Sequence, residues 1–158
     1  MKRYALILCC AIVAIVAGAQ QAVTITDFCY KHQDASTVIL ETYSQSDIIS
    51  NLRNKGFVIV KQERLNGVGA GNAATTFTKV TLQRKGANGK CTTVVIDEYP
   101  IHITFGTLKE ANAFVKGAID LGWFKREGGY ITSRLESLFG VNAFQQKSKY
   151  IIFSCSVP

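Results

Sequence analysis

The chain has 158 residues, a formal net charge of +7 and a hydrophobic content of 47%. This length fits one domain that buries roughly two thirds of its unfolded surface, so its core requires neither a disulfide scaffold nor a metal. The basic residues are scattered in runs of no more than two, which favours a solvated basic surface, with attraction to an anionic lipid surface, an acidic glycan or nucleic acid as the alternative. The secreted location predicted from residues 1–19 argues against nucleic acid.

Residues 1–19 have the pattern of a secretory signal peptide. A basic start, an apolar run over residues 4–16 and a small-x-small cleavage site at residues 17–19 follow one another. The apolar run is shorter than the roughly 20 residues that span a bilayer, and bulky Leu8 stands where a lipoprotein site needs a small residue. We therefore expect cleavage before Gln20, a secreted or periplasmic location and no stable membrane span after cleavage, with an uncleaved anchor and lipidation as alternatives.

Three cysteines remain after this cleavage: Cys29, Cys91 and Cys155. In an oxidising compartment the expectation is one disulfide and one remaining thiol, and the sequence does not choose among the three pairings. The remaining thiol is buried and unreactive, pairs between chains, or acts as a nucleophile with His32 or His102 as its base.

The first elements of the remaining chain are two strands and a helix. Residues 23–28 predict a weak strand, and residues 38–43 predict a better one because they are rich in β-branched and aromatic side chains. Residues 46–56 predict a helix with Ser44 or Ser46 at its N-cap and a glycine at its end.

The next segment predicts two strands around a glycine-rich turn. One strand begins at residues 57–60 and another covers residues 77–83. Gly67, Gly69 and Gly71 lie between them, but no helix and no Lys-Ser/Thr pair follow, so the glycines do not form a phosphate-binding loop. They predict a hairpin tip that is able to contact a partner.

The centre of the chain predicts a hairpin. Asn88-Gly89 is a strong two-residue turn signal, and the β-branched run at residues 91–96 returns from it. Residues 101–105 continue as a strand with His102 on its polar face.

The second helix has the strongest local signal. Thr107 and Glu110 form a capping box, and the apolar residues that follow recur at helical spacing up to Ile119. Strands are then predicted from Trp123 and over residues 150–157, where alternate side chains face one way.

The two halves of the chain resemble each other. The strand at 38–43 matches that at 101–105, Gly56-Phe57 matches Gly122-Trp123, and the strands with Cys91 and Cys155 match at a similar offset. This pattern predicts two tandem strand-helix-strand repeats. The topology resembles small secreted inhibitor folds built from tandem helix-plus-sheet repeats, such as the β-lactamase inhibitor protein, but no residue motif carries the resemblance, so it implies no site.

Few residues point to catalysis or metal binding. Cys29 and His32 have the spacing of half a zinc site, but no second pair of ligands follows, so we expect neither a metal nor another cofactor. Asp97 and Glu98 are adjacent on a strand and point to opposite faces, which argues against a shared acid-base role.

We therefore predict one α+β domain over residues 20–158, an antiparallel sheet with two main helices on one face. The predicted function is that of a non-catalytic secreted or periplasmic protein that binds a macromolecule or envelope component. Trp123 and Tyr130 join the glycine-rich tip as predicted partner contacts, because aromatic residues are favoured at binding surfaces. The alternative is a small secreted thiol-dependent enzyme or hydrolase.

Overall fold

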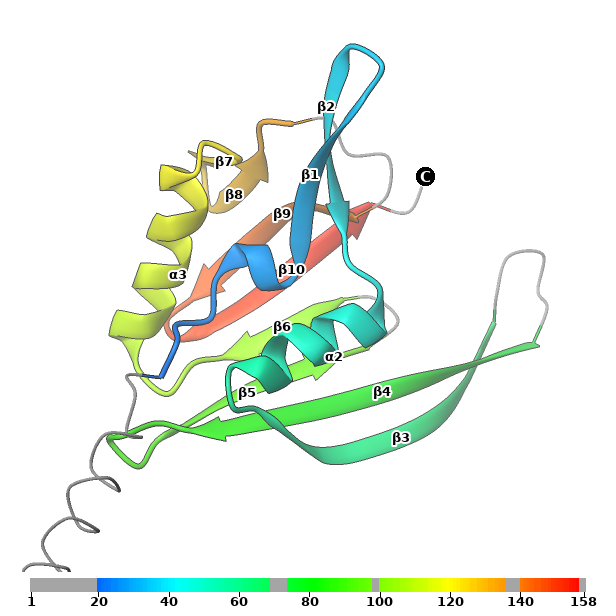
Figure 1. Ribbon diagram of the computed structural model, residues 1–158, viewed down its shortest axis with the longest axis vertical. Helices are drawn as coiled ribbons and strands as arrows, with labels where there is room; N and C mark the ends of the chain where they lie inside the picture. The colour runs from blue at the N-terminus through cyan, green and yellow to red at the C-terminus, as the bar shows by residue number, and fades with distance from the viewer. Residues whose placement is uncertain (1–19, 69–73, 98–99, 136–139, 157–158) are drawn as a thin grey trace, which may run out of the picture.

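The computed structural model describes residues 20–68, 74–97, 100–135 and 140–156 (Figure 1). One short 3₁₀ helix, η1, two α-helices and ten strands lie in these ranges. Their bounds are η1 Ile25–Asp27, β1 Cys29–Asp34, β2 Thr37–Thr42, α2 Gln45–Asn54, β3 Val58–Val68, β4 Ala74–Lys85, β5 Cys91–Ile96, β6 Ile101–Thr104, α3 Leu108–Asp120, β7 Phe124–Glu127, β8 Tyr130–Ser133, β9 Gly140–Lys147 and β10 Tyr150–Ser156.

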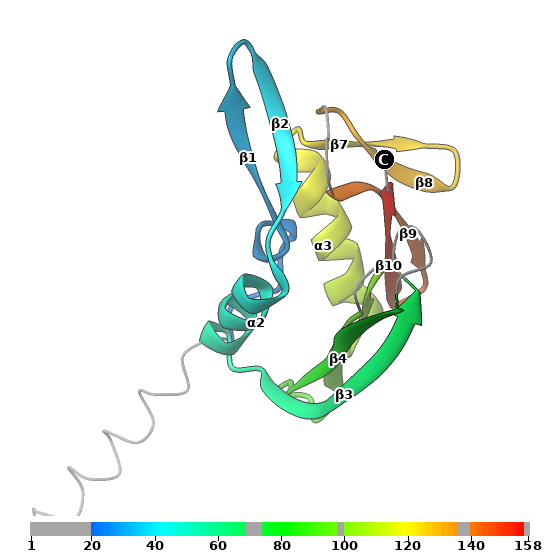
Figure 2. The ribbon, with the colours of Figure 1, turned by 90° about the vertical axis from the view of Figure 1, so that its right-hand side faces the viewer.

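Eight strands form one antiparallel sheet in the order β3-β4-β5-β6-β10-β9-β8-β7. Strands β1 and β2 form a separate antiparallel hairpin that stands away from this sheet (Figure 2). Helices α2 and α3 lie on the same side of the sheet (Figures 1 and 2). The predicted α+β class, antiparallel sheet and two helices on one face are therefore confirmed.

The core lies between the sheet and a layer made of α2, η1, the base of the β1–β2 hairpin and α3. Phe114 of α3 is at its centre, because its ring contacts those of Phe28, Phe105, Phe144 and Phe153 at centroid distances of 5.6–6.1 Å. The strands supply alternate buried side chains: Val80, Leu82, Val94, Ile96, Ile101, Ile103, Phe124, Ile131, Phe144, Ile151 and Phe153. We call this the inner face of the sheet, and the opposite one the outer face.

The helix ends follow the sequence closely. Ser44 caps α2 by accepting a hydrogen bond from the amide of Asp47 (3.2 Å), and Thr107 and Glu110 form the predicted capping box of α3. Gly56 follows α2 with a φ of 84°, a left-handed conformation that favours glycine. These local interactions fix where each helix begins or ends.

Each helix precedes a meander of four strands. Strands β3 to β6 follow α2, strands β7 to β10 follow α3, and the two meanders meet where β6 pairs with β10. The strand before α2, however, lies in the separate hairpin, and Cys91 begins a third strand whereas Cys155 lies in a fourth. The repeated order is one of helix and meander, and internal duplication itself stays a prediction.

The sequence predicts one strand wrongly and misses others. The strand predicted at residues 23–28 is instead η1, because the Asp27 carboxylate accepts a hydrogen bond from the Thr24 amide at 2.7 Å and turns the chain. Strands β1, β8 and β9 are not predicted from the sequence, since none has regular apolar alternation. The segment predicted to be a leader, residues 1–19, lies outside the described residues.

The expected disulfide is not formed by the described cysteines. Cys29 is completely buried at the base of the hairpin, Cys91 is exposed at the start of β5, and both are free thiols. The side chain of Cys155 lies outside the described residues.

Candidate functional site

The outer face carries two rows of side chains that follow the pairing register across six strands. Because cross-strand partners share a face, the register alone places the members of each row side by side. The first row is Lys61, Thr81, Val95, His102, Ile152 and Gln145, and the second is Val58, Gln83, Thr93, Thr104, Tyr150 and Lys147.

These rows form a mixed polar and apolar surface. The eight side chains inside the rows and Gln145 at one end are half-buried, while the other three ends, Lys61, Val58 and Lys147, are exposed. The half-burial comes from neighbouring side chains in the sheet, because no described helix or hairpin packs on this face (Figure 2). An antiparallel sheet tolerates such a solvated face when alternate residues are polar.

A polar cluster lies near the centre of the outer face. The Nδ1 atom of His102 is hydrogen-bonded to the hydroxyl of Tyr150, and their rings lie 5.8 Å apart. Beside them, Lys79 Nζ is 3.3 Å from the Asp97 carboxylate. Partial burial and the positive charge of Lys79 lower the pKa of His102, and the negative charge of Asp97 opposes this effect. The shift favours the neutral form of the imidazole.

The described residues among those predicted to contact a partner are not brought together. Gly67 lies in β3 at one edge of the sheet, whereas Tyr130 begins β8 near the other edge and is 47% exposed. Trp123 is partly buried against the core at the end of α3, and its carbonyl accepts a hydrogen bond from the Arg134 amide. Gly69 and Gly71 lie outside the described residues.

The described cysteines do not form a thiol-histidine pair. Burial raises the pKa of Cys29 to about 12, and its Sγ donates to the Ile25 carbonyl at 3.5 Å. Cys91 pairs with Lys85, whereas His102 pairs with Val95, four residues further along β5 and thus about 13 Å away at the usual strand rise. Neither thiol has a histidine base within reach.

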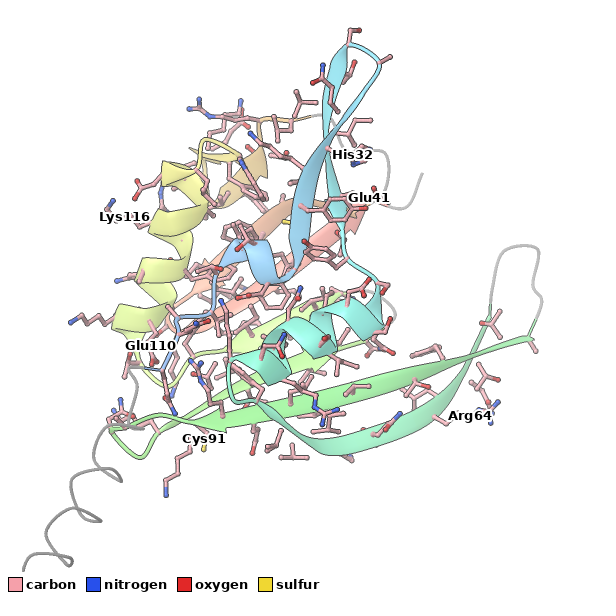
Figure 3. The ribbon with its side chains drawn as sticks, in the orientation of Figure 1. His32, Glu41, Arg64, Cys91, Glu110 and Lys116 are labelled. Carbon is pink, nitrogen blue, oxygen red and sulfur yellow. The ribbon has the colours of Figure 1, made fainter. Side chains whose placement is uncertain are left out.

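His32 belongs to an aromatic cluster on the β1–β2 hairpin. Its Nδ1 lies 3.4 Å from the Glu41 carboxylate, which accepts a hydrogen bond from the Tyr30 hydroxyl at 2.8 Å, and Tyr30 stacks on Tyr43 at 4.7 Å. Figure 3 shows His32 and Glu41 on the hairpin and Cys91 at a distant end of the sheet. The cluster aligns the hairpin strands, since all four side chains lie on its two paired strands or directly after them.

In the part of the chain that the structure describes, no three His, Cys, Asp or Glu side chains form a group able to hold a metal ion. Within the same ranges, neither helix has the length and apolar character needed to cross a membrane. The site residues that sequence reasoning missed are Tyr150 as the partner of His102, and the two rows themselves.

The chain matches no family model, no curated protein and no solved structure. The class of the molecule is therefore defined by its geometry alone. It is an α+β domain whose eight-stranded antiparallel sheet has one open face.

Proposed function

We propose that this chain is an exported, non-catalytic binding protein whose macromolecular partner docks on the outer face of the eight-stranded sheet. The observation that carries the proposal is the pair of cross-strand rows, which no described element covers. Six strands at the usual spacing of about 4.8 Å give a surface about 24 Å across, which approaches the width of a standard protein interface.

The composition of the rows supports a protein or envelope component as the partner. Threonine, valine, isoleucine and tyrosine side chains form a partly apolar centre, while Lys61 and Lys147 lie at opposite ends. Interfaces commonly combine an apolar centre that contains tyrosine with a charged rim. Such a surface binds a large partner through complementary shape and hydrogen bonds, and this binding requires no nucleophile.

Export is supported by the leader pattern of residues 1–19. N-terminal sequencing of the protein isolated from its native cells tests this part directly. A chain that begins at Gln20 is the expected result, and an intact Met1 on a cytosolic protein would contradict it.

The binding part is tested by capture from the native compartment with three baits: the unaltered protein, Val95→Arg and Ser50→Arg. Val95 lies in the middle of the first row, whereas Ser50 is an exposed residue of α2 on the other side of the molecule. A partner captured by the unaltered protein should bind Val95→Arg at least about tenfold more weakly, because a buried interface centre loses more than about 1.4 kcal/mol when a charge is placed in it.

The control gives the result that would overturn the proposal. Ser50→Arg should bind the partner as the unaltered protein does. If Val95→Arg binds normally while Ser50→Arg does not, the partner docks on the helical side and the outer face is not the site.

A further inference from the structure

A cleft lies on the inner side of the molecule, between the first described residues, the β4–β5 turn and the start of α3. Its volume is about 450 Å³, within the usual range for small-molecule sites. Figure 3 shows Glu110 beside the first described residues at this end of the molecule. The cleft is separate from the outer face, because its strand residue, Arg84, alternates with the residues of the outer rows.

Arg84 is the charged group inside this cleft. Arg84 is only 9% exposed, and burial lowers the pKa of its guanidinium. One nitrogen, Nη1, donates to the carbonyls of Gln21 (2.7 Å) and Lys55 (2.9 Å). The guanidinium also lies 4.8 Å from the centre of the Phe57 ring.

The remaining donors of Arg84 have no partner of their own among the described residues. Nε and Nη2 make no hydrogen bond there, and no described carboxylate lies within ion-pair distance of the guanidinium. The nearby Asp27 is paired with Lys55 at 2.8 Å and is held by Thr24. The negative charges of Glu110 and Asp27 favour the protonated guanidinium without an ion-pair contact, and the free nitrogens of Arg84 remain available to a ligand.

The walls of the cleft define the rest of the ligand. Ala113 is the exposed apolar residue of the cleft wall, and the largely buried Val23, Phe105 and Phe114 border the cleft from the core. A planar guanidinium matches a carboxylate through two parallel hydrogen bonds, and the apolar walls match a hydrocarbon body.

Glu110 also lines the cleft, and its negative charge acts on Arg84. Its Oε2 accepts hydrogen bonds from the amide (2.9 Å) and the hydroxyl (3.0 Å) of Thr107, so it is held at the start of α3. Its negative charge opposes an anionic ligand, and a neutral amide in its place would remove this repulsion while keeping the cap.

We propose that this cleft binds a small organic acid with an apolar tail, its carboxylate on Arg84 and its tail against the cleft wall at Ala113. This function is independent of the partner surface proposed above. The outer-face variant Val95→Arg should retain it, so failure of one proposal does not imply failure of the other.

Calorimetric titration of the purified protein, expressed with its own leader, tests the cleft with decanoate and decanol as probes. Decanoate should bind with a dissociation constant below about 1 mM, and decanol at least about tenfold more weakly. Ala113→Trp should abolish decanoate binding because Ala113 lines the cleft from an exposed position on α3, whereas Ser50→Trp, on α2, should leave it unchanged.

Two charge variants complete the test without filling the cleft. Arg84→Lys should weaken decanoate binding by about tenfold, since lysine lacks the paired donors, and Glu110→Gln should strengthen it several-fold. Equal binding of decanoate and decanol, normal binding by Ala113→Trp, or weaker binding by Glu110→Gln would each overturn the proposal. Absence of binding at about 1 mM decanoate would overturn it as well.

Discussion

The buried ion pair between Lys55 and Asp27 makes a sharp prediction about stability. Lys55 follows α2 and its Nζ lies 2.8 Å from the carboxylate of Asp27 in η1, with side chains only 15% and 7% exposed. Lys55 also donates to the Ala22 carbonyl at 2.7 Å. The pair thus joins the first described segment to the end of α2.

Replacement of Lys55 by methionine should destabilise the protein by about 3 kcal/mol. Removal of one partner of a buried pair costs about 3–5 kcal/mol, because the other charge stays buried without compensation. Methionine keeps the apolar stem, and Asp27 keeps its hydrogen bond from the Thr24 amide, which places the expected cost at the lower end. For a domain of this size the melting temperature should fall by about 10 °C.

Urea unfolding followed by tryptophan fluorescence measures this cost, because the chain has one tryptophan, Trp123, packed against the core. The control is Lys116→Met, which breaks the pair of Lys116 with Asp120 on the exposed side of α3. That pair is largely exposed to solvent and should contribute less than about 0.5 kcal/mol. In Lys55→Met/Asp27→Asn, the combined cost should be at least about 1 kcal/mol below the sum of the single costs. Equal costs for Lys55→Met and Lys116→Met, or simple additivity in the double variant, would refute this account of the pair.

Three further predictions concern groups described above. Because the pKa of His102 is lowered in the folded protein, the unfolded chain binds a proton more readily, and stability should fall as the pH drops below about 6.5. Melting curves at pH 5 and 7.5 should show a smaller loss of stability for His102→Gln than for the unaltered protein. An equal loss would contradict this prediction. Thr107→Ala should cost about 1 kcal/mol in urea unfolding through loss of the α3 cap, and Thr107→Ser should restore most of it, whereas no loss would show that the cap is redundant. Cys91 should react with iodoacetamide in the folded protein while Cys29 reacts only after unfolding, as peptide mass mapping would show; labelling of Cys29 at the rate of Cys91 would contradict its burial.

The elements that the sequence predicts well are those with local signals. The caps at Ser44 and Thr107 lie within three residues of the groups they bind, so short-range sequence determines where the helices begin. Strand β5 is predicted with its observed bounds, because its β-branched run directly follows a two-residue turn signal.

The elements that the sequence misses depend on distant partners. Strand β1 is mostly polar and is ordered by pairing with β2. At residues 23–28 the short-range hydrogen bond between Thr24 and Asp27 stabilises a 3₁₀ turn instead of the expected strand. The outer-face site also depends on residues that are distant in the sequence. Its central pair joins His102 to Tyr150, 48 residues further along the chain, through the β6–β10 register, and no local pattern indicates that pairing.

The meeting of β6 and β10 also has a consequence for how the sheet assembles. Each meander forms from neighbours in the chain, but β6 and β10, the strands that join the meanders, are paired over only three positions and are separated in the chain by α3 and strands β7 to β9. Until β10 is available, both β6 and β9 are open edges that invite pairing with other chains. A chain truncated before Tyr150 should therefore aggregate more readily than the full chain, because β10, the last strand, joins the two halves of the sheet.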